Sequence, residues 1–118
     1  MSTNSATSFA GPMDTEDSVD YVGEFDLLLQ SGETINAGFT VSPTTESATL
    51  GFEIDTGAKV PVLETGDQKV LFWAKVNASN QADAIFSDDG IQCEVEITVT
   101  TSDTRTYQRT FLVTVKQL

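Results

Sequence analysis

Residues 95–115 read VEITVTTSDTRTYQRTFLVTV, two runs of alternating apolar and polar residues separated by a short polar segment. Within each run the apolar side chains recur at every second position. This is the period of a β-strand that turns one face to the core, and a short polar segment joins two such strands as a hairpin. The sequence therefore predicts a closing hairpin with strands at 92–101 and 105–116.

The same alternation recurs upstream in shorter segments. On one face of YVGEFDLLL (residues 21–29) lie Tyr21, Gly23, Phe25, Leu27 and Leu29. Other short strands are expected at 35–41, 50–54, 69–76 and 84–86, and 59–64 contains Pro61 and suits an edge strand or a loop. No apolar period of 3.6 residues lasts long enough for a helix of ordinary length.

Seven or eight short strands separated by turn residues predict an all-β fold, an antiparallel immunoglobulin-like β-sandwich. A closed barrel is the competing arrangement. The segment KVLFWAKV (69–76) is apolar on both faces, so it is expected to be covered on both sides, with Trp73 in the core. No second cysteine flanks Trp73, so "immunoglobulin-like" refers to architecture only.

Residues 1–18 are polar and acidic and show no alternation, which predicts a flexible N-terminal arm in front of a β-sandwich domain at 19–118. Phe9 and Met13 are the large apolar side chains of this arm after the initiator, and they are candidates for docking on a partner. The segment has no basic region followed by an apolar stretch, so it is not expected to be a signal peptide.

The composition disfavours several classes of partner. The formal net charge is −12, and an acidic surface repels phosphate backbones and anionic lipid heads. No stretch approaches the ~20 apolar residues of a membrane helix. We therefore expect neither nucleic acid nor membrane as a partner. Cys93, the one cysteine, alternates with apolar residues and is expected to be buried.

The sequence offers little chemistry. It has no histidine and no glycine-rich phosphate loop, and most carboxylates lie at the polar positions of alternating strands. We predict no enzymatic activity and no cofactor; a glycosidase with two carboxylates is the enzymatic alternative. Acidic clusters at 14–20 (Asp14, Glu16, Asp17 and Asp20) and 87–90 lack the ligand pattern of a helix-loop-helix calcium site, so no metal is predicted.

Two arginines fall just after the hairpin turn in an acidic chain. Arg105, Tyr107 and Arg109 share one face of the last strand. One hypothesis places Arg109 at the rim of the sandwich, paired with a carboxylate such as Asp20, Glu24 or Asp26. The other is that the hairpin presents all three side chains to another protein, because arginine and tyrosine often dominate binding energy at interfaces.

The hairpin resembles the closing segment of fiber–tail adaptor proteins, small structural proteins of tailed phages. The positions that match that family's pattern are Ile97-Thr98, Thr100-Thr101, Arg105-Thr106 and Arg109-Thr110-Phe111. Toward the N-terminus the similar features are Pro12, Asp14, Asp20-Tyr21, Phe25 and GETI at 32–35. Residues 43–90 depart from the pattern, and Thr104 stands where the family has glycine.

The resemblance implies a virion component of the phage tail or neck, made in the host cytoplasm. Its partners would be other virion proteins, a tail or neck ring protein and a tail fiber. It would be present in several copies that follow the symmetry of the assembly, and it would bind by strand addition or through the arm. The alternatives are a capsid head decoration protein and a carbohydrate- or host-surface-binding module.

Overall fold

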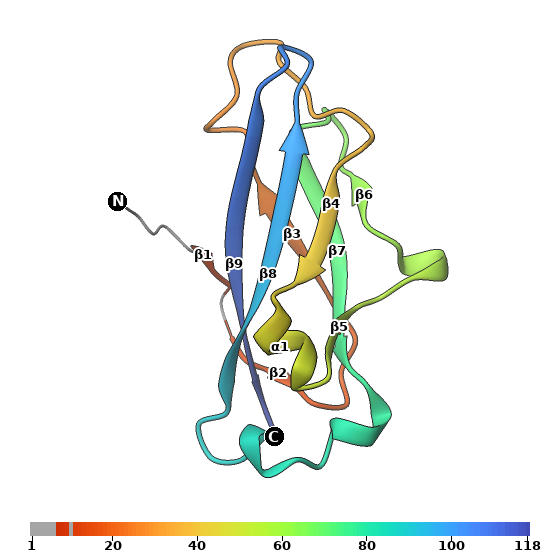
Figure 1. Ribbon diagram of the computed structural model, residues 1–118, viewed down its shortest axis with the longest axis vertical. Coiled ribbons are helices and arrows are strands. Elements are labelled where there is room, and N and C mark those ends of the chain that lie inside the picture. The colour runs from red at the N-terminus through yellow and green to blue at the C-terminus, as the bar shows by residue number, and fades with distance from the viewer. Residues whose placement is uncertain (1–6, 10) are drawn as a thin grey trace.

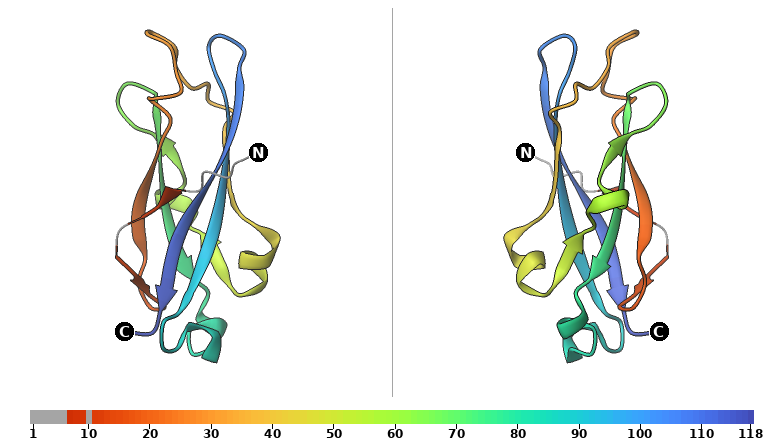
Figure 2. Two further views of the ribbon diagram at one scale, coloured as in Figure 1. Left: turned by 90° about the vertical axis from the view of Figure 1, so that its left-hand side faces the viewer. Right: turned by 90° about the vertical axis from the view of Figure 1, so that its right-hand side faces the viewer.

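The computed structural model describes residues 7–9 and 11–118 and shows two β-sheets packed face to face (Figures 1 and 2). Over these residues the first sheet has five strands in the order β1-β9-β8-β4, with β2 also paired to β9, and the second has four, β3-β7-β5 with β6 paired to β7. The sheets are separate, so the predicted sandwich is confirmed and a closed barrel is excluded for the described part of the chain.

The first sheet contains β1 (Thr7–Ser8), β2 (Met13–Asp14), β4 (Thr40–Pro43), β8 (Ile91–Thr100) and β9 (Thr106–Lys116). The second contains β3 (Val19–Glu24), β5 (Phe52–Ile54), β6 (Val62–Leu63) and β7 (Lys69–Val76). In the described part of the chain four short helices connect the strands: α1 (Thr45–Thr49), η1 (Gly57–Lys59), η2 (Ala78–Asn80) and η3 (Ala84–Phe86). No helix of the described residues is long and apolar enough to cross a membrane.

The predicted closing hairpin is confirmed. β8 and β9 pair antiparallel from Ile91↔Val115 to Thr100↔Thr106, and the turn between them passes through Thr104 with a φ of 64°. Alternation decides the faces, because successive strand residues point to opposite sides. The inward side chains of the hairpin are buried: Cys93, Val95, Ile97, Val99, Phe111, Val113 and Val115.

β7 lies inside the second sheet, with β3 on one side and β5 and β6 on the other. Its inner side chains Val70, Phe72, Ala74 and Val76 are buried. The outer face is only half-buried, so the prediction that Trp73 lies in the core was wrong. The period of two places Trp73 opposite Phe72, and the Lys59 ammonium lies 4.4 Å from the centre of its ring.

Three predicted strands differ from the structure. The strand through 20–29 ends at Glu24, because the Leu28 N–H donates to the Phe25 carbonyl (2.9 Å) and turns the chain; Leu27 is consequently 96 % exposed. The strand through 35–41 starts only at Thr40, after a single bridge between Ile35 and Thr101. Residues 84–86 form η3, which buries Phe86, rather than a strand.

The described part of the predicted arm is attached to the sandwich. β1 and β2 pair in parallel with β9, and Phe9 donates its N–H to the Leu112 carbonyl (3.0 Å). Met13 is only 1 % exposed, and Phe9 packs against the core. Residues 7–9 and 11–18 therefore do not form the expected flexible arm. The side chains of Phe9 and Met13 instead cover the apolar edge of the sandwich beside β9. Residues 1–6 and 10 lie outside the described residues.

Candidate interaction site

Among the residues that the structure describes, the edge of the second sheet at β3 is open. β3 pairs with β7 alone among the described residues, from Val19↔Ala74 to Glu24↔Lys69. The Phe25 N–H continues this ladder by donating to the Gln68 carbonyl (3.1 Å). Hydrogen-bonded and non-hydrogen-bonded pairs alternate along antiparallel strands. The backbone groups of Asp20, Val22 and Glu24 therefore point away from β7, toward the open edge.

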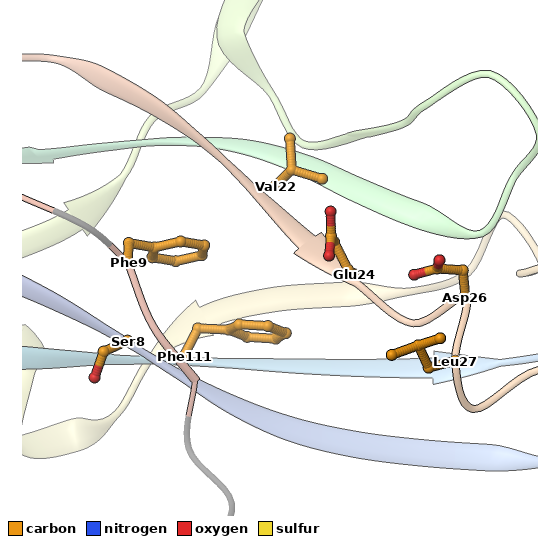
Figure 3. A pocket seen from close by; sticks show the side chains of 7 residues that line it. All are labelled: Ser8, Phe9, Val22, Glu24, Asp26, Leu27 and Phe111. Carbon is orange, nitrogen blue, oxygen red and sulfur yellow. The ribbon is translucent and has the colours of Figure 1, made fainter.

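A hollow of about 400 Å³ lies beside this edge, between β3 and the β1–β9 side of the first sheet (Figure 3). The rings of Phe9 and Phe111 lie one above the other in it, with centroids 5.8 Å apart and planes at 12°. The described residues that line it are Ser8, Phe9, Val22, Glu24, Asp26, Leu27 and Phe111. The hollow thus has an aromatic floor, and the fully exposed Leu27 lies at one end.

Phe9 closes the inner part of this gap between the sheets. Its ring stacks on Tyr21 of β3 at 4.6 Å, so one side chain from the N-terminal segment contacts both sheets. Gly23 allows the close approach of β3 here, because a Cβ at this position would meet the Ile97 Cδ1 at 2.7 Å and the Phe111 ring at 3.1 Å. The aromatic floor therefore depends on Phe9 and on the missing side chain of Gly23.

The rim of the hollow is acidic. Glu24 and Asp26 line it, and none of the described residues that line it is a lysine or an arginine. Glu24 has an ion-pair partner in Lys69 (3.7 Å), but both side chains are largely exposed, so the pair contributes little to stability. Among the described residues Asp26 has no ion-pair partner. A hollow with an aromatic floor and an acidic rim, beside backbone groups that no described strand pairs with, is suited to binding a cationic polypeptide.

Another carboxylate, Glu33, lies nearby in the sequence but in a different environment. It is 2 % exposed and accepts hydrogen bonds from the Thr101 hydroxyl, from the Gln30 N–H (2.8 Å) and from Arg105 (3.3 Å). The Thr101 and Gln30 hydrogen bonds, with the charge of Arg105, hold the pKa of Glu33 below its ordinary range. A buried carboxylate with three donors is a structural element that ties the 30–35 turn to the hairpin.

The predicted interface residues of the hairpin, Arg105, Tyr107 and Arg109, lie in different environments. Arg105 is the paired arginine of the hairpin, and its partner is Glu33. Tyr107 donates its hydroxyl to the Leu28 carbonyl (3.3 Å), and the Arg109 guanidinium lies 5.7 Å from the Tyr107 ring. The pairing of Arg109 with Asp20, Glu24 or Asp26 was wrong: Arg109 donates to the Gln108 carbonyl (2.8 Å), and no described carboxylate forms an ion pair with it.

Phe9 and Met13 differ in what they can offer a partner. Met13 is buried against the protein's own core, which removes it from any surface. Phe9 is half-buried and lines the hollow, where one part of its ring remains accessible.

The sequence analysis did not identify Glu33, Leu27 or the acidic rim as parts of a site. The one available signal was Arg105, since an arginine beside an apolar strand in so acidic a chain requires a carboxylate partner.

The structure offers no further chemistry among the described residues. No group of three or more His, Cys, Asp or Glu side chains there is placed to hold a metal ion. Asp14 instead accepts the N–H groups of Leu118 (2.8 Å) and Glu16 (3.1 Å), which lower its pKa. Burial raises the pKa of the Cys93 thiol to about 12, so it is unreactive at neutral pH.

No protein-family model matches the chain, and no curated protein matches it significantly.

Proposed function

We propose that this protein is a non-enzymatic structural component of a tailed-phage virion, an adaptor that joins the tail or neck machinery to the tail fibers. The proposal rests on the resemblance of the closing hairpin and of the GETI segment to fiber–tail adaptor proteins. About half of the chain separates these two matched segments.

The observation that carries the proposal is that the two matched segments are in direct contact. Glu33 of GETI binds Arg105 and Thr101 of the hairpin turn, and Ile35 forms a bridge with Thr101. The Ser102 N–H also donates to the Thr34 carbonyl (2.8 Å). A pattern that describes one structural unit predicts contact between its two segments, and this contact supports the resemblance.

The architecture suits an adaptor. A β-sandwich with an open sheet edge can bind an extended segment of a neighbour by strand addition, and such an interaction requires no catalytic group. Several copies would follow the symmetry of the ring on which they assemble.

The test is immunogold labelling of intact, purified phage particles with antibody against this protein, viewed by electron microscopy. Label at the tail or neck is the expected result. Label over the capsid would replace the adaptor with a head decoration protein. Unlabelled particles that also remain negative by immunoblot after denaturation would overturn a virion role. The matched control is a phage preparation in which the gene is disrupted and which therefore cannot carry the protein.

A further inference from the structure

We propose that the hollow beside β3 binds an extended, basic segment of a partner protein, which adds as a strand to the open edge of β3 and places an apolar side chain over Phe9 and Phe111. This inference rests on the hollow itself. It holds whether or not the protein is a virion adaptor, and the two proposals fail in separate experiments.

The backbone provides the first part of the argument. The outward N–H and C=O groups of Asp20, Val22 and Glu24 have no partner in another described strand. A free edge of this kind is a template for a further strand, and native proteins usually protect such edges with proline, bulges or lysine. β3 reads VDYVGE and carries neither proline nor lysine. Its two charged side chains, Asp20 and Glu24, are acidic, so they repel an acidic strand but not a basic one.

The hollow provides the second part. A strand added to β3 runs along the gap between β3 and β1, so its side chains on one face point toward Phe9 and Phe111. The cavity of about 400 Å³ has room for an apolar side chain there. Leu27, 96 % exposed at the end of the hollow, would be covered by the same segment. Leu27 and the aromatic floor together form the apolar surface that the added strand would cover.

The acidic side chains along the edge indicate which kind of segment binds there. Asp20, Glu24 and Asp26 follow one another along the edge, and opposite charges placed across neighbouring strands stabilise their pairing. The expected partner segment therefore carries lysine or arginine between its apolar residues. A second copy of this chain fits poorly, because β3 paired with itself in antiparallel register about Val22 would place Asp20 opposite the second copy's Glu24. Two chains of net charge −12 also repel each other.

The test uses the whole chain and a short, fluorescently labelled peptide of alternating lysine and valine. Binding is measured by fluorescence anisotropy, and the backbone amide signals of the isotope-labelled protein are followed by NMR. We expect saturable binding with the largest signal changes at Val22 and Glu24. Three controls use the same sequence: a peptide with glutamate in place of lysine, a peptide N-methylated at alternate amides, and one with serine in place of valine. All three should bind more weakly by about tenfold or more.

Two double variants distinguish the effect of the charges that line the hollow from the effect of the protein's net charge on peptide binding. Glu24→Lys with Asp26→Lys should weaken peptide binding by about tenfold or more, because it reverses the rim. Glu16→Lys with Asp89→Lys changes the net charge equally at exposed positions that do not line the hollow, and it should change binding by less than about threefold.

Four results would overturn the proposal: no binding of the lysine–valine peptide, equal binding of the N-methylated peptide, equal losses in the two double variants, or signal changes at β4 or β5 instead of β3. Sedimentation of the unliganded chain provides a further check. Self-association that an excess of the lysine–valine peptide reverses would assign the hollow to a second copy instead.

Discussion

Glu33 and the pair formed by Glu24 and Asp26 are carboxylates from one stretch of the chain, yet the fold uses them in opposite ways. Glu33 is buried, and its two oxygens accept hydrogen bonds from Thr101, Gln30 and Arg105. Glu24 and Asp26 line the rim of the hollow beside β3 and have little of their own protein to bind. A carboxylate occupied by internal donors holds the structure together, whereas one left beside unpaired backbone remains available to a partner.

The floor of the hollow belongs to the core, so its loss should have the largest effect on stability. Phe111 is 3 % exposed and contacts Phe9 and Phe25 through its ring. Phe111→Ala should lower the free energy of unfolding by about 3–5 kcal/mol, measured by chemical denaturation, because it removes a buried ring and leaves a cavity. A loss below about 1 kcal/mol would mean that the floor is a surface feature and would remove the distinction between floor and rim.

Loss of the buried carboxylate of Glu33 should destabilise the protein more than loss of the exposed carboxylate of Glu24. Glu33→Ala leaves Thr101, Gln30 and Arg105 without their acceptor, and we expect a melting temperature lower by about 5–10 °C in thermal denaturation followed by circular dichroism. Glu33→Gln, which keeps one acceptor oxygen, should lose less.

The matched change at the rim, Glu24→Ala, should shift the melting temperature by less than about 2 °C, because its ion pair with Lys69 is exposed. Equal shifts in Glu33→Ala and Glu24→Ala would contradict the contrast between the two carboxylates.

The contrast also predicts a pH dependence. The pKa of Glu33 is lower in the folded protein than in the unfolded chain, so its contribution to stability is complete above the unfolded value of about 4.3 and is lost as the pH falls toward the folded value. In thermal melts between about pH 7 and pH 3, stability should decline at the acidic end, and Glu33→Gln should decline less steeply there.

A remaining acid dependence is expected in Glu33→Gln. The carboxyl pKa of Asp14 is lowered by the Leu118 N–H, and that of Asp55 by the Thr56 N–H, and both groups are unchanged in this variant. Identical pH profiles for the wild type and Glu33→Gln would show that Glu33 titrates alike in the folded and unfolded states.

The sequence was sufficient to predict what depends on alternation. The hairpin at β8 and β9 and the inner face of β7 follow from the period of two, because that period places one face of each strand in the core. The choice between two sheets and a closed barrel required the strand order of the structure. Alternation failed where hydrogen bonds outside the ladder ended a strand. The turn at Phe25–Leu28 exposes Leu27, although the apolar pattern continues through Leu29.

The candidate site was largely beyond sequence reasoning. Arg105, Tyr107 and Arg109 were placed on one strand face, but the choice of partner depends on which loop folds back on the hairpin, and alternation carries no information on this. The attachment of Phe9 and Met13 likewise depends on apolar surface that exists only once β3 and β9 are assembled. Contacts between distant segments are therefore where prediction from this sequence stops.

Leu27→Ser is expected to have the smallest effect on stability, and it best separates a role in folding from a role in binding. Because the side chain is already exposed, Leu27→Ser should change the free energy of unfolding by less than about 0.5 kcal/mol. The same variant should weaken binding of the lysine–valine peptide several-fold, because the added strand would no longer cover an apolar side chain. Val62→Ser, at an exposed position on the opposite edge of the second sheet, is the control and should alter neither quantity. A Leu27→Ser protein that binds as tightly as the wild type would place Leu27 outside the contact and restrict the site to Phe9, Phe111 and the edge of β3.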